Sequence, residues 1–255
     1  MKLLLLGGTA DARRLAKRFL CDEEGRDDIE IVYSVAGLVR MPDVDCEVIS
    51  GGFSQFGGLQ AYLEQQKIDA VLDATHPYAE AMTSTAWSVT QQLGMSYWRF
   101  HRAPWQAQAG DKWQMFAGWP QLLAALTEFK SVFLTAGQIN ELAVATFAKY
   151  GEQNQKQLLR TAVQPKHPLS DSMSWIKAIG PFDLENELTL MKQNQVDVLV
   201  SKNSGGKATE AKLEAARNLD IPVMMLARPA LPDGITAFDQ IDACSEHILN
   251  FGSKK

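Results

Sequence analysis

Residues able to bind a phosphorylated ligand follow the first apolar run of the chain. Leucines at residues 3–6 are followed by Gly7-Gly8-Thr9 and then by apolar side chains at helical spacing over residues 10–20. A glycine-rich turn between a buried strand and a helix exposes backbone N–H groups that can hold a pyrophosphate. The turn departs from G-x-G-x-x-G because Thr9 and Ala12 replace the second and third glycines. We interpret it as a nucleotide-binding turn in which the Thr9 hydroxyl is an additional phosphate donor. A plain strand-to-helix turn is the alternative.

The end of the next apolar run indicates which dinucleotide would fit. Residues 29–34 read as a strand that ends at Ser34, with Arg40 nearby and no Asp or Glu at the strand end. An acidic residue there would bind the ribose hydroxyls of NAD, whereas a small hydroxyl and an arginine suit a 2′-phosphate. The sequence therefore favours NADP(H).

A third polar segment, residues 73–79, follows the predicted strand at residues 68–72. It contains His76, which could donate a proton at neutral pH. Because Pro77 holds the preceding residue in an extended conformation, His76 could instead order the loop or hydrogen-bond to a cofactor. Both roles stay open.

The second half of the chain contains a comparable segment. The apolar run at residues 198–200 ends in Ser201-Lys202-Asn203-Ser204-Gly205-Gly206, and a helical pattern follows. Basic residues gather in this half and in the approach to it, and such a local set in a chain of net charge −5 would suit a polyanionic substrate. The set comprises Arg102, Arg160, Lys166, His167, Lys202, Lys207 and Arg228. The net negative charge excludes a general nucleic-acid binder.

Strands that alternate with helices predict an α/β protein with doubly wound parallel sheets. The regular pattern is interrupted between residues 103 and 120, where tryptophans lie among prolines and glycines. We therefore expect two domains, residues 1–110 and 111–255. Because the polar segments follow strands, they should lie at one edge of each sheet.

The composition adds further expectations. Cys21, Cys46 and Cys244 lie far apart without metal-ligand spacing, so we predict no metal site and a reducing compartment. The leucine run at residues 3–6 is too short for a signal peptide, and no apolar run is long enough to span a membrane. We expect a cytoplasmic protein without a membrane partner, and a monomer.

Several motifs together identify a resemblance that extends over nearly the whole chain. They are residues 6–9, 34–37, 51–53, 73–79 (DATHPYA), 102–105, 180–182, 200–206 (VSKNSGG) and 228–229. With these motifs the chain resembles the precorrin-6A reductases and cobalt-precorrin-6A reductases of cobalamin biosynthesis.

The resemblance implies an NADPH-dependent reduction of precorrin-6A, or its cobalt form, to precorrin-6B. Hydride would reach a carbon at the direct link between rings A and D of the tetrapyrrole, and a proton would reach its neighbour. It also implies two Rossmann-like domains with a cleft between them, residues 1–110 binding NADP and residues 111–255 binding substrate.

The resemblance and the loop chemistry together give candidate site residues. For the cofactor they are Gly7, Gly8, Thr9, Ala10, Ser34, Arg40, Gly51, Gly52, Phe53, Thr75, His76, Pro77, Tyr78, Asn203 and Ser204. For the substrate they are Arg102, Trp105, Arg160, Lys202 and Arg228. Lys202 and His76 are the candidate proton donors, with water as the alternative. The family usually has an arginine where Leu38 stands, and a basic or acidic pair at Gln138 and Ile139.

Two other functions stay open at this point. One is a reductase on the same architecture that uses NADP with a different substrate. The other is a non-catalytic regulator that binds NADPH without transferring hydride. The sequence does not distinguish a cobalt-containing from a metal-free macrocycle.

Overall fold

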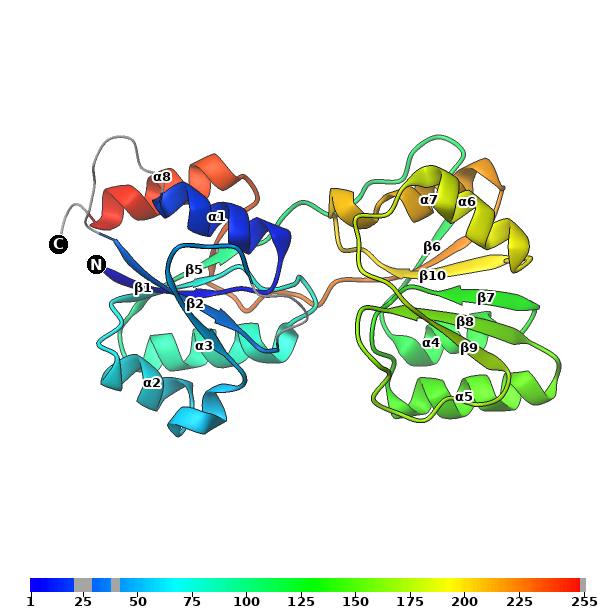
Figure 1. Ribbon diagram of the computed structural model, residues 1–255, viewed down its shortest axis with the longest axis horizontal. Helices are drawn as coiled ribbons and strands as arrows, with labels where there is room; N and C mark the ends of the chain where they lie inside the picture. The colour runs from blue at the N-terminus through cyan, green and yellow to red at the C-terminus, as the bar shows by residue number, and fades with distance from the viewer. Residues whose placement is uncertain (21–28, 38–41, 253–255) are drawn as a thin grey trace. The chain divides into compact units, whose positions relative to one another are not determined.

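The computed structural model describes residues 1–20, 29–37 and 42–252 (Figure 1). The chain forms two compact units, the first made of residues 1–103 and 229–255 and the second of residues 104–228. Each unit contains one six-stranded sheet in which every neighbouring pair of strands is parallel. The predicted α/β fold with doubly wound, Rossmann-like parallel sheets is therefore confirmed.

The first unit has the strand order β12-β5-β4-β1-β2-β3. Its elements are β1 (Lys2–Leu6), α1 (Ala10–Leu20), β2 (Glu30–Val35), β3 (Glu47–Ser50), the 3₁₀ helix η1 (Phe53–Phe56), α2 (Leu59–Gln65), β4 (Ala70–Asp73), α3 (Glu80–Gln92), β5 (Ser96–Phe100), β12 (Thr236–Phe238) and α8 (Ile241–Gly252). Within this unit, α1 and α8 cover one face of the sheet and α2 and α3 cover the other (Figure 1).

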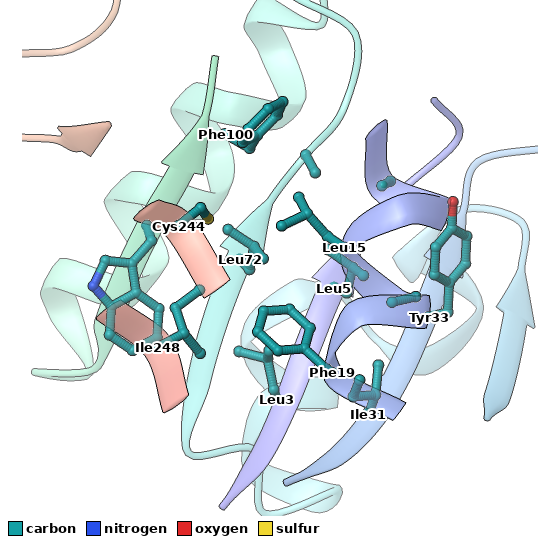
Figure 2. Packing of buried hydrophobic residues seen from close by; sticks show 14 of the residues in the cluster. Leu3, Leu5, Leu15, Phe19, Ile31, Tyr33, Leu72, Phe100, Cys244 and Ile248 are labelled. Atoms are coloured by element: carbon teal, nitrogen blue, oxygen red, sulfur yellow. The ribbon is translucent and has the colours of Figure 1, made fainter. Parts of the chain in front are cut away.

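The continuous leucine run of β1 reflects this double cover, because a central parallel strand is buried on both faces. Leu3 and Leu5 pack under α1 and α8, and Leu4 and Leu6 pack against the opposite layer. Figure 2 shows the first of these clusters, in which Phe19 of α1 and Ile248 of α8 lie over the sheet.

The second unit has the order β6-β11-β10-β7-β8-β9. Its elements are β6 (Trp113–Phe116), α4 (Trp119–Ala125), β7 (Ser131–Leu134), α5 (Glu141–Glu152), β8 (Lys156–Thr161), β9 (Met173–Lys177), α6 (Leu184–Gln193), β10 (Val198–Lys202), the 3₁₀ helix η2 (Lys207–Thr209), α7 (Ala211–Asn218) and β11 (Val223–Leu226). In this unit α6 and α7 cover one face, and α4 and α5 cover the other (Figure 1).

The structure divides the chain differently from the predicted domains 1–110 and 111–255. The chain leaves the first unit after Ala103, and residues 229–255 return to it. The returning segment adds β12 beside β5, with Thr236 opposite Trp98, and α8 buries Cys244 in the core of the first unit. Hydrophobic periodicity predicts that a strand or helix forms, but it does not say which sheet the element joins. Among the described residues, no helix has the length and apolar character needed to cross a membrane.

Candidate functional site

The turn between β1 and α1 rests on the side chain of Tyr33. Gly7 N donates a hydrogen bond to Ser34 O (2.7 Å), and Gly8 N donates to the Tyr33 hydroxyl (3.2 Å). A Cβ on Gly7 would lie 2.4 Å from the Tyr33 ring, so only glycine fits there, and Gly8 has φ of +97°. An α-helix that begins at Ala10 contains no carbonyl acceptor for its first N–H groups. This helix start is therefore suited to an anionic ligand.

The Thr9 hydroxyl, which the sequence predicts to be an additional phosphate donor, is hydrogen-bonded within the protein. Its oxygen accepts from Ala12 N (3.0 Å), and it donates its proton to Ala74 O (2.8 Å). Thr9 therefore caps α1 and ties the glycine turn to the segment after β4. The additional phosphate donor expected at Thr9 is thus already used within the protein.

The ends of β2 and β3 lie beside this turn. Ser34 is buried near the end of β2, and Gly51 N donates to Val35 O (2.9 Å) at the end of β3. Gly51 and Gly52 precede η1, and the Phe53 ring packs on that of Tyr62 with centroids 5.3 Å apart. Arg40, the expected partner of a 2′-phosphate, lies outside the described residues.

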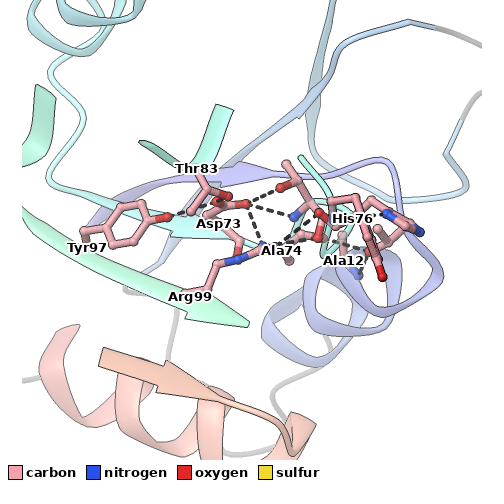
Figure 3. A network of polar contacts seen from close by, with 10 residues as sticks. Ala12, Asp73, Ala74, His76, Thr83, Tyr97 and Arg99 are labelled. Atoms are coloured by element: carbon pink, nitrogen blue, oxygen red, sulfur yellow. Dashed lines mark hydrogen bonds and ion pairs between the residues drawn. The ribbon is translucent and has the colours of Figure 1, made fainter. Parts of the chain in front are cut away.

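The segment after β4 is built around Asp73 (Figure 3). The carboxylate accepts hydrogen bonds from the backbone N (2.9 Å) and hydroxyl (2.7 Å) of Thr75, from the Thr83 hydroxyl (2.7 Å) and from the Tyr97 hydroxyl (2.9 Å). Arg99 Nη1 lies 2.8 Å from Asp73 Oδ1. Burial and the neighbouring Asp73 raise the pKa of Tyr97 far above its ordinary range, so its phenol stays protonated as a donor.

His76 takes part in the order of the same loop. Its Nδ1 accepts a hydrogen bond from Tyr78 N (3.3 Å), and the two rings lie 5.7 Å apart. Pro77 between them is buried. A nitrogen that accepts a hydrogen bond cannot donate its own proton in that state, so the geometry favours the loop-ordering role over proton donation from Nδ1.

In the second unit, the segment after β10 is fixed mainly by Asn203. The Asn203 side chain accepts from Trp105 N (2.8 Å) and donates to Trp105 O (3.1 Å), while Arg228 Nε donates to Asn203 O (2.7 Å). Lys202 is half-buried at the end of β10, and burial lowers its pKa. Ser204 N donates to Lys202 O (2.9 Å). The predicted cofactor residue Asn203 thus serves first to hold the backbone of Trp105.

Two of the candidate substrate residues, Arg160 and Trp105, lie in the core of the second unit. Arg160 is on β8, its side chain is 6% exposed, and it forms a bidentate ion pair with Glu187. Its guanidinium also lies over the Phe182 ring, 3.9 Å from the centroid. The predicted contact of Arg160 with a substrate carboxylate does not fit this arrangement, because the charge of Arg160 is buried and neutralised by Glu187. Trp105 is also buried, with Lys212 Nζ 5.4 Å from its ring centroid.

Arg102, a third candidate, forms an ion pair within the first unit. Its Nη1 lies 2.5 Å from Asp11 Oδ2, and both side chains are 16% exposed. Asp11 belongs to the first turn of α1, where a carboxylate would repel a phosphate. Arg102 offsets that charge.

A pocket of about 420 Å³ lies on the second unit, beside the connection from β8 to β9. It is lined by Gln164, Pro165, Lys166, His167, Pro168, Leu169 and Trp175. Gln138, which follows β7, holds this connection in place by donating to Gln164 O (3.1 Å) and accepting from Lys166 N (3.0 Å). The pocket combines an apolar wall with a lysine and a histidine.

Sequence reasoning missed Tyr33, Arg99 and Gln138 as residues that shape these segments. Tyr33 and Arg99 lie inside strands, where buried side chains look like ordinary core residues. Gln138 differs in sequence from the family pattern, but that difference does not indicate which segment its side chain holds. Over the part of the chain that the structure describes, no group of three His, Cys, Asp or Glu side chains could hold a metal ion.

A parallel α/β unit with a glycine turn after its first strand has the architecture on which proteins of the dinucleotide-binding class are built. The second parallel unit carries a pocket lined in part by a lysine and a histidine. The comparisons with known proteins narrow the class further.

The chain belongs to the precorrin-6x reductase CbiJ/CobK family, whose model matches residues 2–248. The precorrin-6A reductase of Mycobacterium tuberculosis is 35% identical over 265 residues, which cover 99% of each chain. That of Rhodobacter capsulatus is 38% identical over 237 residues, covering 91% of this chain and 89% of the relative. A solved structure of CobK precorrin-6A reductase has a TM-score of 0.84 and 33% identity, covering 99% of this chain and 97% of that one. The predicted family and oxidoreductase class are confirmed.

Proposed function

We propose that the protein reduces precorrin-6A to precorrin-6B with NADPH in cobalamin biosynthesis. The observation that carries the proposal is the hydrogen-bonded edge of the first unit. There the glycine turn and the segment after β4 are joined through the bond from Thr9 to Ala74 O. The close similarity to proteins named precorrin-6A reductases supports the choice of substrate.

NADPH would bind along this edge of the first unit. The backbone N–H groups at the start of α1 would hold its pyrophosphate, and Gly51, Gly52 and residues 75–78 would contact the rest of the dinucleotide. Ser34 at the end of β2, in place of an acidic residue, supports NADPH over NADH. When bound, the nicotinamide supplies the hydride, so the protein has to provide position and a site that excludes water.

The pocket beside the β8–β9 connection would bind part of the macrocycle. Trp175 and the two prolines offer apolar contact, while Lys166 offers a positive charge and His167 a ring N–H donor to acetate and propionate carboxylates. Its volume of about 420 Å³ would receive an edge of the tetrapyrrole. Lys202 is the favoured proton donor in this proposal, because burial lowers its pKa and so eases proton release.

A pair of lysine variants tests the substrate pocket. Lys166→Ala should raise the KM for the macrocycle by about three- to tenfold, because one charged contact is lost, with NADPH binding unchanged. Lys177→Ala is the matched control, since Lys177 is exposed on β9 and does not line the pocket. Equal KM values for both variants would remove this pocket from the substrate site.

The activity itself is tested by the loss of NADPH absorbance in the near ultraviolet, with and without precorrin-6A. The cobalt form of the macrocycle and NADH are tested in parallel. We expect oxidation that requires both NADPH and the metal-free macrocycle. NADPH binding without oxidation in the presence of the genuine substrate would favour a regulator instead. A cytoplasmic location, a monomeric state and the cleft between the two domains stay predictions.

A further inference from the structure

An ion pair in the first unit is buried where the sheet meets the proposed cofactor site. Asp73 and Arg99 have side-chain exposures of 0% and 1%, and their charged atoms lie 2.8 Å apart. Burying two charges costs free energy that their attraction often does not recover, and well-packed apolar residues commonly serve as well or better. Stability alone therefore does not account for this pair.

Arg99 gathers the backbone of the segment that follows β4. Its Nη1 donates to Asp73 O (2.9 Å) and Thr75 O (3.1 Å), and its Nη2 donates to His76 O (3.3 Å). One rigid, planar guanidinium thus fixes carbonyls over a stretch of four residues. Lysine has a compact ammonium group and could not span them.

Asp73 completes the same arrangement from the opposite side. It accepts from both the backbone N and the hydroxyl of Thr75, which turns the chain away from β4. The next carbonyl, that of Ala74, accepts the Thr9 hydroxyl. The buried pair is thereby connected to the glycine turn through the backbone of Ala74 and the two hydrogen bonds of the Thr9 hydroxyl (Figure 3).

We propose that Asp73 and Arg99 are positioning residues for cofactor binding. They hold residues 74–78 and, through Ala74 and Thr9, the glycine turn in one conformation, so that the cofactor meets a preorganised surface. Neither side chain has to touch the cofactor for this role. The inference rests on the proposed function for the identity of the ligand, but the conformational claim can be measured without any ligand.

The test compares Arg99→Lys with a matched variant, Thr83→Val. Arg99→Lys keeps a positive charge beside Asp73 and loses the bonds to Thr75 O and His76 O. Thr83→Val also removes one buried hydrogen bond to Asp73, but it leaves the bonds to the segment 74–78 in place. If the pair served only to stabilise the fold, the two variants would have the same effects on amide exchange over residues 74–79 and on the KM for NADPH.

Backbone amide hydrogen exchange of the ligand-free protein is the first measurement. Arg99→Lys should raise exchange about tenfold or more in peptides that cover residues 74–79, since one to two charged hydrogen bonds are lost. It should also raise the KM for NADPH more than it lowers kcat. Thr83→Val should lower the melting temperature. Amide exchange in those peptides and the KM for NADPH should stay at their wild-type values.

If Arg99→Lys does not fold, Thr75→Val provides the milder test, because it removes the single hydroxyl bond from Thr75 to Asp73. It should show a smaller rise in exchange over the same peptides. Wild-type exchange at residues 74–79 in the folded variant would overturn the proposal. A wild-type protein that binds no NADPH would instead contradict the proposed function, and the exchange result would still decide the conformational claim.

Discussion

At the scale of single residues, two buried tyrosines of the first unit differ in what their hydroxyls do. The Tyr33 hydroxyl accepts a hydrogen bond from the Gly8 N–H, whereas the buried Tyr62 hydroxyl has no hydrogen-bond partner among the residues that the structure describes. Burial raises the pKa of both phenols, so both are neutral at ordinary pH. Only the Tyr33 hydroxyl supports the turn assigned to the cofactor pyrophosphate.

Tyr33→Phe should therefore weaken NADPH binding by about three- to tenfold, because the turn loses a hydrogen bond worth roughly 0.5–1.5 kcal/mol that holds the Gly8 N–H in place. The ring that packs under Gly7 is kept. Tyr62→Phe is the matched control and should leave both affinity and stability unchanged or slightly improve stability. Fluorescence titration with NADPH measures both. Similar affinities for the two variants would contradict the role given to Tyr33.

The burial of Lys212 makes the stability of the protein depend on pH. It is buried in the second unit, where desolvation and the nearby Arg160 lower its pKa to about 7, and Glu187 acts in the opposite direction. The unfolded chain keeps this proton up to about pH 10. Between these limits the unfolded state binds one more proton, so raising the pH stabilises the fold.

Lys212→Met should accordingly reduce the rise of stability with pH between about 7 and 10 by up to ~1.4 kcal/mol per pH unit, the value for one proton. Relative to the wild type, the variant should gain more free energy of unfolding at pH 6 than at pH 9. Urea unfolding of the wild type and the variant across this range gives the difference. Parallel stability curves for the two proteins would show that Lys212 keeps its proton in the folded state.

At the scale of elements, the β-loop-α units were predictable because buried parallel strands leave a continuous apolar run, as in residues 3–6. The roles of the polar residues that follow each strand could not be predicted from the sequence. Thr9, Thr75 and Asn203 are residues of the kinds that bind ligands, yet their side chains have partners within the protein. Those of Thr9 and Asn203 hold the backbone of other segments, and the Thr75 hydroxyl donates to the Asp73 carboxylate. A polar side chain looks the same in sequence whether its partner is a ligand or a distant carbonyl. The partner of Arg160, Glu187, is likewise invisible without the fold.

At the scale of the whole molecule, the return of residues 229–255 to the first unit makes that unit depend on both ends of the chain. The exposed, three-residue strand β12 gives almost no sequence signal. The helix α8 has a clear sequence signal, but its amphipathic face does not specify which sheet it packs against. Ile248 of α8 is fully buried against residues from β1, α1 and β4.

Ile248→Ala should therefore destabilise the first unit by about 2–5 kcal/mol, as expected for removing a buried isoleucine side chain. Amide exchange should increase in residues 1–103 and 229–252, with little change in residues 104–228. Leu213→Ala in the core of the second unit is the control and should show the reverse pattern. Increased exchange confined to residues 104–228 in Ile248→Ala would contradict this division of the chain.

The transfer of deuterium from labelled NADPH to the macrocycle tests the central claim most directly. NADPH carrying deuterium at both C4 positions of the nicotinamide is incubated with precorrin-6A and the protein in ordinary water. The mass of the product is then measured by mass spectrometry. We expect a product that has gained one deuterium from the cofactor and one hydrogen from solvent, with one NADPH oxidised for each macrocycle reduced. Reduction of the macrocycle without incorporation of the label, or the absence of reduction with authentic precorrin-6A, would contradict the proposed function.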